Sequence, residues 1–318
     1  MNTIRRATGL LIVEVRNSNP NGDPDRESDP RTRSHDKRGI ITGVSFKRKL
    51  RDLVENKESD VWDIISKRLG IKNSNEFCIL ESKDRGFTDV KDATDAWKNV
   101  LKLIDNKDEN KAVANKYWDA RIFGATFLEK GDDSPGGGGK SERKYIRTGV
   151  AQFGLGLSVA PVRVERQTLT KKTSAQEGKD RGMAPLGDRH VEHGVYCMPF
   201  FVNPTAAKNS GCTAKDIALM LSLIKCAYPN TISNTRQGTV EVRHAWYGEH
   251  EDALGSFSDF RFIDAMTPSK KDKNPKEPSN QSMDEEYSVP KDFPDELKGK
   301  VKNFCDLCET LPDWCKNV

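Results

Sequence analysis

Three cations occur at helical spacing in the segment from Val44 to Val54. Lys47, Arg48 and Arg51 would share one side of a helix there, and apolar residues would occupy the other side. Cations in this arrangement can follow a phosphodiester backbone while the apolar side anchors the helix in a core. The segment therefore predicts a phosphate-binding helix, and a solvated cationic face is the ordinary alternative.

A turn rich in asparagine and aspartate lies upstream of this segment. Residues 17–25 read NSNPNGDPD, and the Asn-Pro and Asn-Gly pairs favour tight turns. The amides of Asn19, Asn21 and Gly22 could contact phosphate or ribose. We therefore expect this turn to contribute to the same binding surface as the cationic helix.

Two later segments carry residues suited to unpaired nucleotides. Gln152 and Phe153 offer an amide and an aromatic face to a base. Residues 163–193 are basic and polar, but they include a small apolar group that begins at Met183. An apolar tip on a basic hairpin can wedge between stacked bases while its stem holds phosphates. The cations of this stem are Arg163, Arg166, Lys171 and Lys172.

Acidic and histidine residues suggest weaker, catalytic alternatives. The carboxylates between Asp23 and Asp29 could bind Mg²⁺, but the arginines interleaved with them favour a salt-bridged loop. His35 has no evident partner for general-base chemistry. His190 and His193 would point to opposite faces of a strand, which disfavours a shared metal ion.

Two further motifs fall short of known sites. The segment from Cys305 to Cys315 has a CxxC pair but no fourth zinc ligand at a suitable spacing. Residues 134–141 resemble a P-loop but lack its first glycine and a clear strand-to-helix context. We therefore predict no metal site, no cofactor and no catalytic residue.

Composition and charge limit the class of protein. The chain has 318 residues, is 35% hydrophobic and 31% charged, and carries a net charge of +4, which by itself says little about partners. The cations are concentrated, with twelve Lys or Arg against six acidic residues in 1–51 and eleven against five in 140–190. No apolar run approaches a membrane span, and seven cysteines fit reduced thiols. We expect a cytoplasmic protein with a basic patch and no membrane partner.

Apolar periodicity predicts an α+β core in the order strand, helix, strands, helix, strands. Stripped of insertions, this order is that of a ferredoxin-like or RNA-recognition fold. The expected strands are 9–15, 149–159, 195–202, 238–246 and 256–263, and one face of the first of them is apolar. The expected helices are 44–54, parts of 60–118, 213–228 and 296–308.

Five blocks of sequence resemble one family. The chain is similar to the CRISPR-associated Cas7 backbone subunits of type I Cascade, especially those of subtypes I-C and I-B, a branch of the RAMP superfamily. The blocks occur in family order between about residues 9 and 265. They are NPNGDP at 19–24, ITGVSFKRKLR at 41–51, WDARIFGA at 118–125, RTGVAQFG at 147–154 and residues 190–196.

The resemblance implies a modified RNA-recognition palm over residues 1–266, with a helical insertion at about 57–118 and a protruding thumb at about 162–192. Residues 267–318 would form a linker and a C-terminal helical tail. Several copies would stack head to tail along a crRNA beside other Cascade subunits. The guide would pair with target DNA, and another protein would cut it.

Residues and resemblance together predict a non-catalytic RNA scaffold. The predicted RNA-binding residues are Asn19, Asn21, Lys47, Arg48, Arg51, Arg121, Gln152, Phe153, Arg163, Arg166, Lys171, Lys172, Met183 and His190.

Two other functions stay open at this point. Some related backbone subunits of type III complexes cleave bound RNA with a loop aspartate, so a metal-dependent endoribonuclease using Asp23, Asp25 or His35 is the main alternative. A single-copy RNA-binding protein outside any CRISPR complex is the other.

Overall fold

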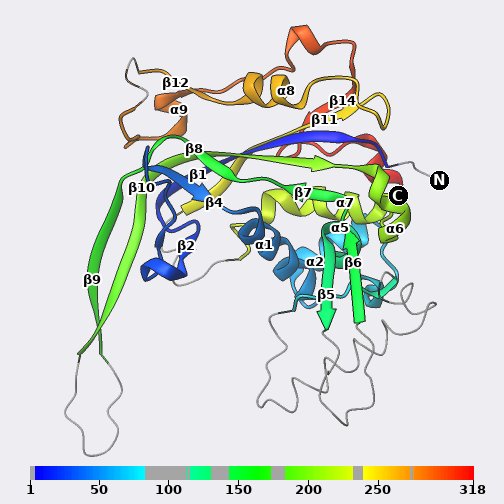
Figure 1. Ribbon diagram of the computed structural model, residues 1–318, viewed down its shortest axis with the longest axis horizontal. Coiled ribbons are helices and arrows are strands. Elements are labelled where there is room, and N and C mark those ends of the chain that lie inside the picture. Colours follow the sequence, from blue (N-terminus) through cyan, green and yellow to red (C-terminus); the bar gives the residue numbers. More distant parts are fainter. Residues whose placement is uncertain are drawn as a thin grey trace, which may run out of the picture.

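An antiparallel sheet of eight strands forms the centre of the molecule (Figure 1). The computed structural model describes residues 4–82, 113, 115–129, 143–172, 183–231, 239–272, 274 and 276–318. The strand order is β14-β11-β1-β10-β8-β4, and β7 and β9 also pair with β10. These strands are β1 (Ala7–Ser18), β4 (Arg38–Ile41), β7 (Ala151–Phe153), β8 (Gly156–Pro161), β9 (Val164–Lys172), β10 (Met183–Val202), β11 (Thr239–His250) and β14 (Val301–Asp306).

Helices cover one face of this sheet, drawn below it in Figure 1. Side chains cap the first turns of the main ones: Thr42 caps α1, and Thr213 forms a capping box with Asp216 at α7. The predicted helices at 44–54 and after 213 are thereby confirmed. The helices on this side are α1 (Gly43–Glu55), α2 (Asp60–Arg68), α5 (Trp118–Phe123), α6 (Ala207–Ser210) and α7 (Ala214–Leu223).

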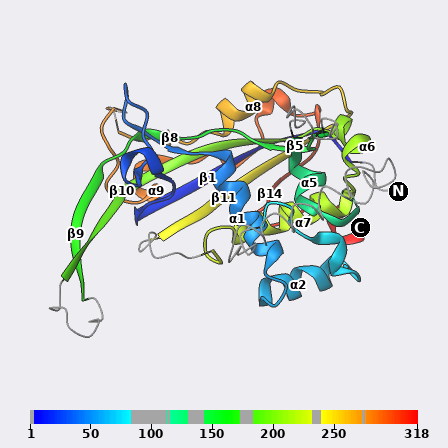
Figure 2. The ribbon, with the colours of Figure 1, turned by 60° about the horizontal axis from the view of Figure 1, so that its bottom comes forward.

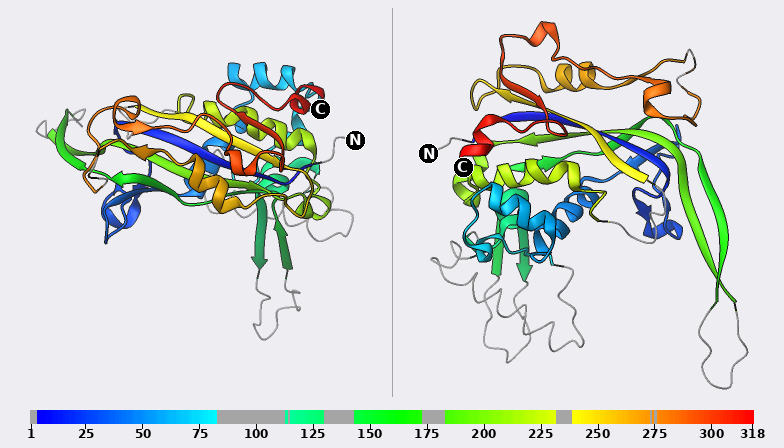
Figure 3. Two further views of the ribbon diagram at one scale, coloured as in Figure 1. Left: turned by 90° about the horizontal axis from the view of Figure 1, so that it is seen from above. Right: turned by 180° about the vertical axis from the view of Figure 1, so that it is seen from behind.

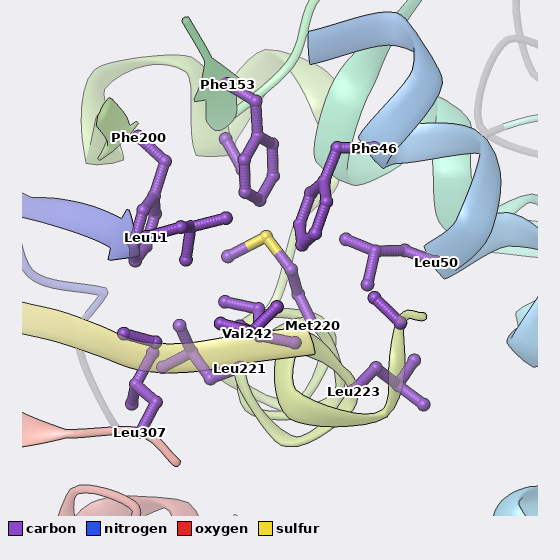
Figure 4. Packing of buried hydrophobic residues seen from close by; sticks show 14 of the residues in the cluster. Leu11, Phe46, Leu50, Phe153, Phe200, Met220, Leu221, Leu223, Val242 and Leu307 are labelled. Atoms are coloured by element: carbon purple, nitrogen blue, oxygen red, sulfur yellow. The ribbon is translucent and has the colours of Figure 1, made fainter. Parts of the chain in front are cut away.

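The main core lies between the sheet and these helices. Leu11 of β1 faces Phe46 and Leu50 of α1 and Met220 of α7 (Figure 4). Phe153 and Phe200 stack here with ring centroids 5.4 Å apart. This cluster explains why α1 has one apolar side: that side packs on the sheet.

The other face of the sheet is also covered. Leu10 and Ile12 of β1 are fully buried against Phe262 and Met266 of α8 and against the segment that follows. The predicted apolar face of the first strand is confirmed, because Leu11, Val13 and Val15 lie in the main core, but the opposite face is buried as well. We call this second layer the C-terminal layer. It contains α8 (Asp259–Met266), β12 (Ser269–Lys270), α9 (Met283–Glu286) and β13 (Tyr287–Ser288).

Two predicted elements near the C-terminus have the opposite secondary structure. Residues 256–263, expected as a strand, lead into α8, which Ser258 caps and which buries Phe262 and Met266 at i,i+4 spacing. Residues 296–308, expected as a helix, contain β14, because the edge of β11 is free to pair there. The predicted strand 149–159 is two strands, β7 and β8.

Two hairpins project from the body (Figure 3). The longer one is formed by β9 and the first part of β10, with Lys172 paired to Met183 at its far described end. The shorter one, β5 (Gly124–Glu129) with β6 (Arg143–Thr148), extends from α5. Residues 83–112, which belong to the segment 60–118 expected to be partly helical, and the loop 134–141 lie outside the described residues. The remaining short elements are β2 (Gly22–Asp23), β3 (Asp29–Pro30) and the 3-10 turns η1 (Pro24–Arg26), η2 (Ser74–Phe77), η3 (Pro204–Ala206), η4 (Ile224–Cys226), η5 (Asp295–Leu297) and η6 (Asp313–Asn317).

In the part of the chain that the structure describes, no helix combines the length and apolarity that crossing a bilayer requires.

A buried carboxylate fastens the C-terminal layer to the sheet. Glu14 of β1 is 4% exposed and accepts hydrogen bonds from the Met283 amide at 2.9 Å, from His193 at 3.1 Å and from Arg16 at 2.7 Å. Arg243 of β11 also pairs with it. Burial alone would raise the pKa of Glu14, but these hydrogen bonds outweigh it and lower the pKa to about 2.

This carboxylate predicts a defined pH dependence of stability. Because the pKa of Glu14 is about 2 when folded and about 4.5 when unfolded, its contribution is present above pH ~4.5 and is lost as the pH falls toward 2. We expect Glu14→Gln to lower the free energy of unfolding by about 3 kcal/mol at pH 7, and by progressively less below pH ~4.5. Urea unfolding over a pH series measures this. Glu241→Gln, an exposed residue opposite Glu14 on β11, is the control; a loss in Glu14→Gln that did not change with pH would contradict the assignment.

Candidate nucleic-acid interface

The two predicted asparagines of the turn point into the protein. Asn19 is 7% exposed, and its Nδ2 donates to the Ser28 carbonyl at 2.8 Å. The Asn21 Oδ1 accepts from the Thr42 amide at 2.9 Å and from its hydroxyl at 3.0 Å. These contacts shape the turn and tie it to the start of α1. The side chains therefore position the phosphate-binding candidates instead of presenting amides to solvent.

The three cations of α1 have different environments. Lys47 is half-buried, with its Nζ 3.4 Å from the Gln152 Oε1 and above the Phe123 ring. Burial lowers the pKa of Lys47, and the positive charge of Arg51 lowers it further. Arg48 is engaged by two carboxylates of its own helix, Asp52 at 2.7 Å and Glu55 at 3.2 Å.

Arg51 does not lie on an exposed side with the other two. Its side chain is 5% exposed, with Nε 3.0 Å from Asp119 of α5 and Nη2 3.1 Å from Glu81. The prediction of one shared cationic side is wrong for this residue, because a carboxylate on a distant segment draws its guanidinium inward. The cation that α1 brings next to Gln152 is thus Lys47.

Arg121 and Phe153 are also internal. The Arg121 guanidinium binds Asp216 of α7 through two hydrogen bonds of 2.6 and 3.0 Å, and both side chains are buried. Phe153 is 8% exposed and packs between Phe46 and Phe200. Alternation along β7 explains the difference from Gln152, which is exposed. This packing does not let Phe153 offer its ring face to a base, so that expectation is wrong.

The base of the long hairpin carries the remaining predicted residues. Arg163 is half-exposed and pairs with Glu192 at 3.0 Å. Arg166 pairs with Asp29, and His190 lies 3.0 Å from Asp188. The strand backbones of Lys171, Lys172 and Met183 belong to the hairpin, and their side chains lie outside the described residues.

The acidic turn is salt-bridged, as its interleaved charges predict. Asp23 lies 3.3 Å from Arg31, and Asp29 pairs with Arg166 (Figure 2 shows this turn beside the hairpin base). Within the described ranges, no three His, Cys, Asp or Glu side chains gather as metal ligands. His193, on the opposite strand face from His190, is buried against Glu14.

Sequence reasoning missed Arg189, which pairs with two of the acidic residues of this turn, Glu27 and Asp29. The signal was present, since Arg189 lies within the predicted thumb. It also lies directly opposite Arg166 in the register of β9 and β10.

Comparison with known proteins identifies the family. Residues 5–290 match the family model described as CRISPR-associated protein Cas7. This chain belongs to the Cas7 family. The resemblance seen in the five sequence blocks is thereby confirmed.

Relatives of this Cas7 chain are distant. The CRISPR-associated protein Cas7 of Haloferax volcanii is 25% identical over 252 residues, which cover 75% of this chain and 68% of that protein. Two solved structures are similar: a CRISPR RNA-guided surveillance complex (15% identity, 78% of this chain and 70% of that one, TM-score 0.41) and one described as pre-nicking (14%, 81% and 81%, TM-score 0.45). At these TM-scores the structural likeness carries no argument, and the family assignment depends on the sequence match.

The Arg121–Asp216 pair predicts a structural role for Arg121 in this Cas7 chain. Arg121→Met leaves the Asp216 carboxylate buried without its main partner, so we expect the free energy of unfolding to fall by about 3 kcal/mol or more. Urea denaturation measures the loss. Arg68→Met is the matched control, because Arg68 is exposed in the last turn of α2. Equal, small losses in both variants would refute the role.

Proposed function

We propose that this chain is a backbone subunit of a type I CRISPR effector complex, or Cascade, of the subtype I-C or I-B kind. In this proposal several copies stack head to tail along a crRNA and hold it for pairing with target DNA. The observation that carries the proposal is the Cas7 family match over residues 5–290. The chain would work with other Cascade subunits in antiviral defence in the cytoplasm.

The sheet supports an RNA-recognition-like palm. Taken in chain order, β1, β8, β10 and β11 form the spatial order β11-β1-β10-β8, with α1 after β1 and α7 before β11. This order matches the βαββαβ arrangement of ferredoxin-like folds, which supports the proposed palm. The hairpin β9–β10 would then be the thumb, and residues 57–118 would contain the helical insertion.

The proposed RNA path runs over side chains that solvent can reach. Lys47 and Gln152 lie at the helix side of the palm, and Arg163 and Arg166 lie at the thumb base. Farther along the thumb, Lys171, Lys172 and Met183 would contact the next nucleotides. Such a surface grips phosphate and sugar without reading sequence, which base pairing by the guide would do instead. Arg48 and His190 would contribute at the rim, while Asn19, Asn21, Arg51, Arg121 and Phe153 would support the path from inside.

We propose that the subunit does not cut nucleic acid. Asp23, one of the three residues that the ribonuclease alternative could use, is held by Arg31 at 3.3 Å and lies near Arg26. A carboxylate neutralised in this way is a poor ligand for Mg²⁺.

Co-expression with a CRISPR array tests the assembly. We expect a large particle that contains several copies of the chain and one short RNA, because each subunit would protect a fixed length of guide. Size-exclusion chromatography with light scattering and analysis of the bound RNA measure this. Recovery of an RNA-free monomer in the presence of the other Cascade subunits would refute the proposal.

Incubation with complementary RNA and Mg²⁺ tests the nuclease alternative: regular cuts that disappear in Asp23→Ala would establish a nuclease.

Lys47 provides a test at one residue. Lys47→Gln removes one phosphate-facing cation, so we expect affinity for single-stranded RNA to fall about threefold or more and equally for all sequences. The slope of log affinity against log salt should become shallower by up to about one unit. Fluorescence anisotropy across a salt series measures both. Lys67→Gln is the control, because Lys67 is exposed on α2 and pairs with Asp63; an identical effect in both variants would contradict a specific role of Lys47.

A further inference from the structure

The turn between β2 and β3 holds two arginines of the thumb base. The Asp29 carboxylate pairs with Arg166 and also lies 3.4 Å from the Arg189 Nε. The Glu27 carboxylate pairs with Arg189, whose guanidinium also donates to the Glu27 carbonyl oxygen. We name Glu27 and Asp29 the acidic clasp. It joins two segments more than 130 residues apart in the chain.

The backbone of this turn is shaped to present the clasp. Glu27 and Ser28 have φ values of 49° and 66°, in the left-handed region that non-glycine residues seldom adopt. Three bonds hold this conformation: the Ser28 amide to the Asp23 carbonyl at 2.8 Å, Asn19 to the Ser28 carbonyl at 2.8 Å, and Arg189 to the Glu27 carbonyl. The turn is therefore positioned by specific contacts. Its backbone lies beside the base of the hairpin (Figure 2), and both carboxylates pair with arginines of the hairpin.

The clasp differs from the ion pairs of the interior in its access to water. In each clasp pair one partner is well exposed and the other is largely covered: Arg166 is 68% exposed and Asp29 14%, and Glu27 is 83% exposed and Arg189 23%. The side chains of Arg51 and Arg121 are only 5% and 6% exposed. A pair with one partner in solvent is weaker than a fully buried pair and is open to competing anions. A buried pair cannot exchange its carboxylate without exposing the core.

We propose that the acidic clasp competes with RNA phosphates for Arg166 and Arg189. This inference rests on the proposed RNA-binding function. Carboxylate and phosphate both match the planar fork of a guanidinium, so a phosphate can take the place that each clasp carboxylate occupies. The thumb base is then self-neutralised in the free subunit, and binding of RNA exchanges one set of anions for another. The clasp lowers the affinity of the thumb base for any single phosphate.

A charge-matched pair of variants tests this competition. Asp29→Asn removes a clasp carboxylate, and Asp25→Asn makes the same change in the same turn at an exposed side chain that forms no ion pair within the described residues. In the full-length chain, we expect Asp29→Asn to bind fluorescein-labelled oligo(U) RNA about two- to fivefold more tightly than the wild type. The gain should shrink at high salt, and Asp25→Asn should show little of it.

Two further variants separate competition from damage to the fold. Glu27→Gln alters the more exposed clasp residue and should give a smaller gain of the same sign, with an unchanged unfolding transition. Combining Asp29→Asn with Arg166→Gln should abolish most of the gain, because the freed cation is then absent.

Each other outcome decides the question. Weaker binding by folded Asp29→Asn and Glu27→Gln would mean that the carboxylates orient the arginines for RNA, which overturns competition. Equal gains in Asp29→Asn and Asp25→Asn would reveal only a change in net charge and would also overturn it. If the wild type binds oligo(U) and the clasp variants match it, only the clasp proposal fails. If neither the wild type nor any variant binds oligo(U), the proposed RNA-binding function fails together with the clasp.

Discussion

The burial of β1 on both faces and its pairing along both edges constrain the rest of the structure. β10 pairs with one edge of β1 and β11 with the other, over almost the whole length of the strand. One face requires the helices α1 and α7, and the other requires the C-terminal layer. A strand buried in this way offers almost no surface of its own to a ligand. In the proposed function, RNA therefore meets the protein on the helix side and on the long hairpin.

The same constraint explains the polar network around Glu14. A carboxylate in a strand that is buried on both faces must find donors within the protein. Arg16, His193, Arg243 and the Met283 amide supply them from four segments. The C-terminal layer is thus held by a shared buried charge as well as by apolar contact. This makes its docking specific, because a shifted layer would leave the carboxylate without the Met283 amide.

Cations in this protein serve two purposes that composition cannot separate. Arg51 and Arg121 cross-link helices through buried carboxylates, and their positive charge does not reach solvent. Lys47, Arg163 and Arg166 lie where an external anion can reach them. Among the described residues, most of the exposed arginines nevertheless have carboxylate neighbours. A basic surface arranged in this way is held in shape before a polyanion arrives, which limits the entropy lost on binding.

Local signals in the sequence determined β1, α1, α7 and β11, because apolar periodicity and capping residues act within one element. The Cas7 family was also readable from ordered sequence blocks. The salt-bridged turn followed from charges that alternate over a few residues. Gln152 and Phe153 could be placed together on one short strand, and the alternation of β7 then separated an exposed amide from a buried ring.

Only the tertiary structure decided which side chains are buried and what covers each face of the sheet. Arg51 and Arg121 turn inward because their carboxylate partners, Asp119 and Asp216, lie 68 and 95 residues away. β14 is a strand because β11 offers it a free edge, not because of its own periodicity. These outcomes depend on contacts between distant segments, and a pattern confined to a short stretch of sequence does not predict such contacts.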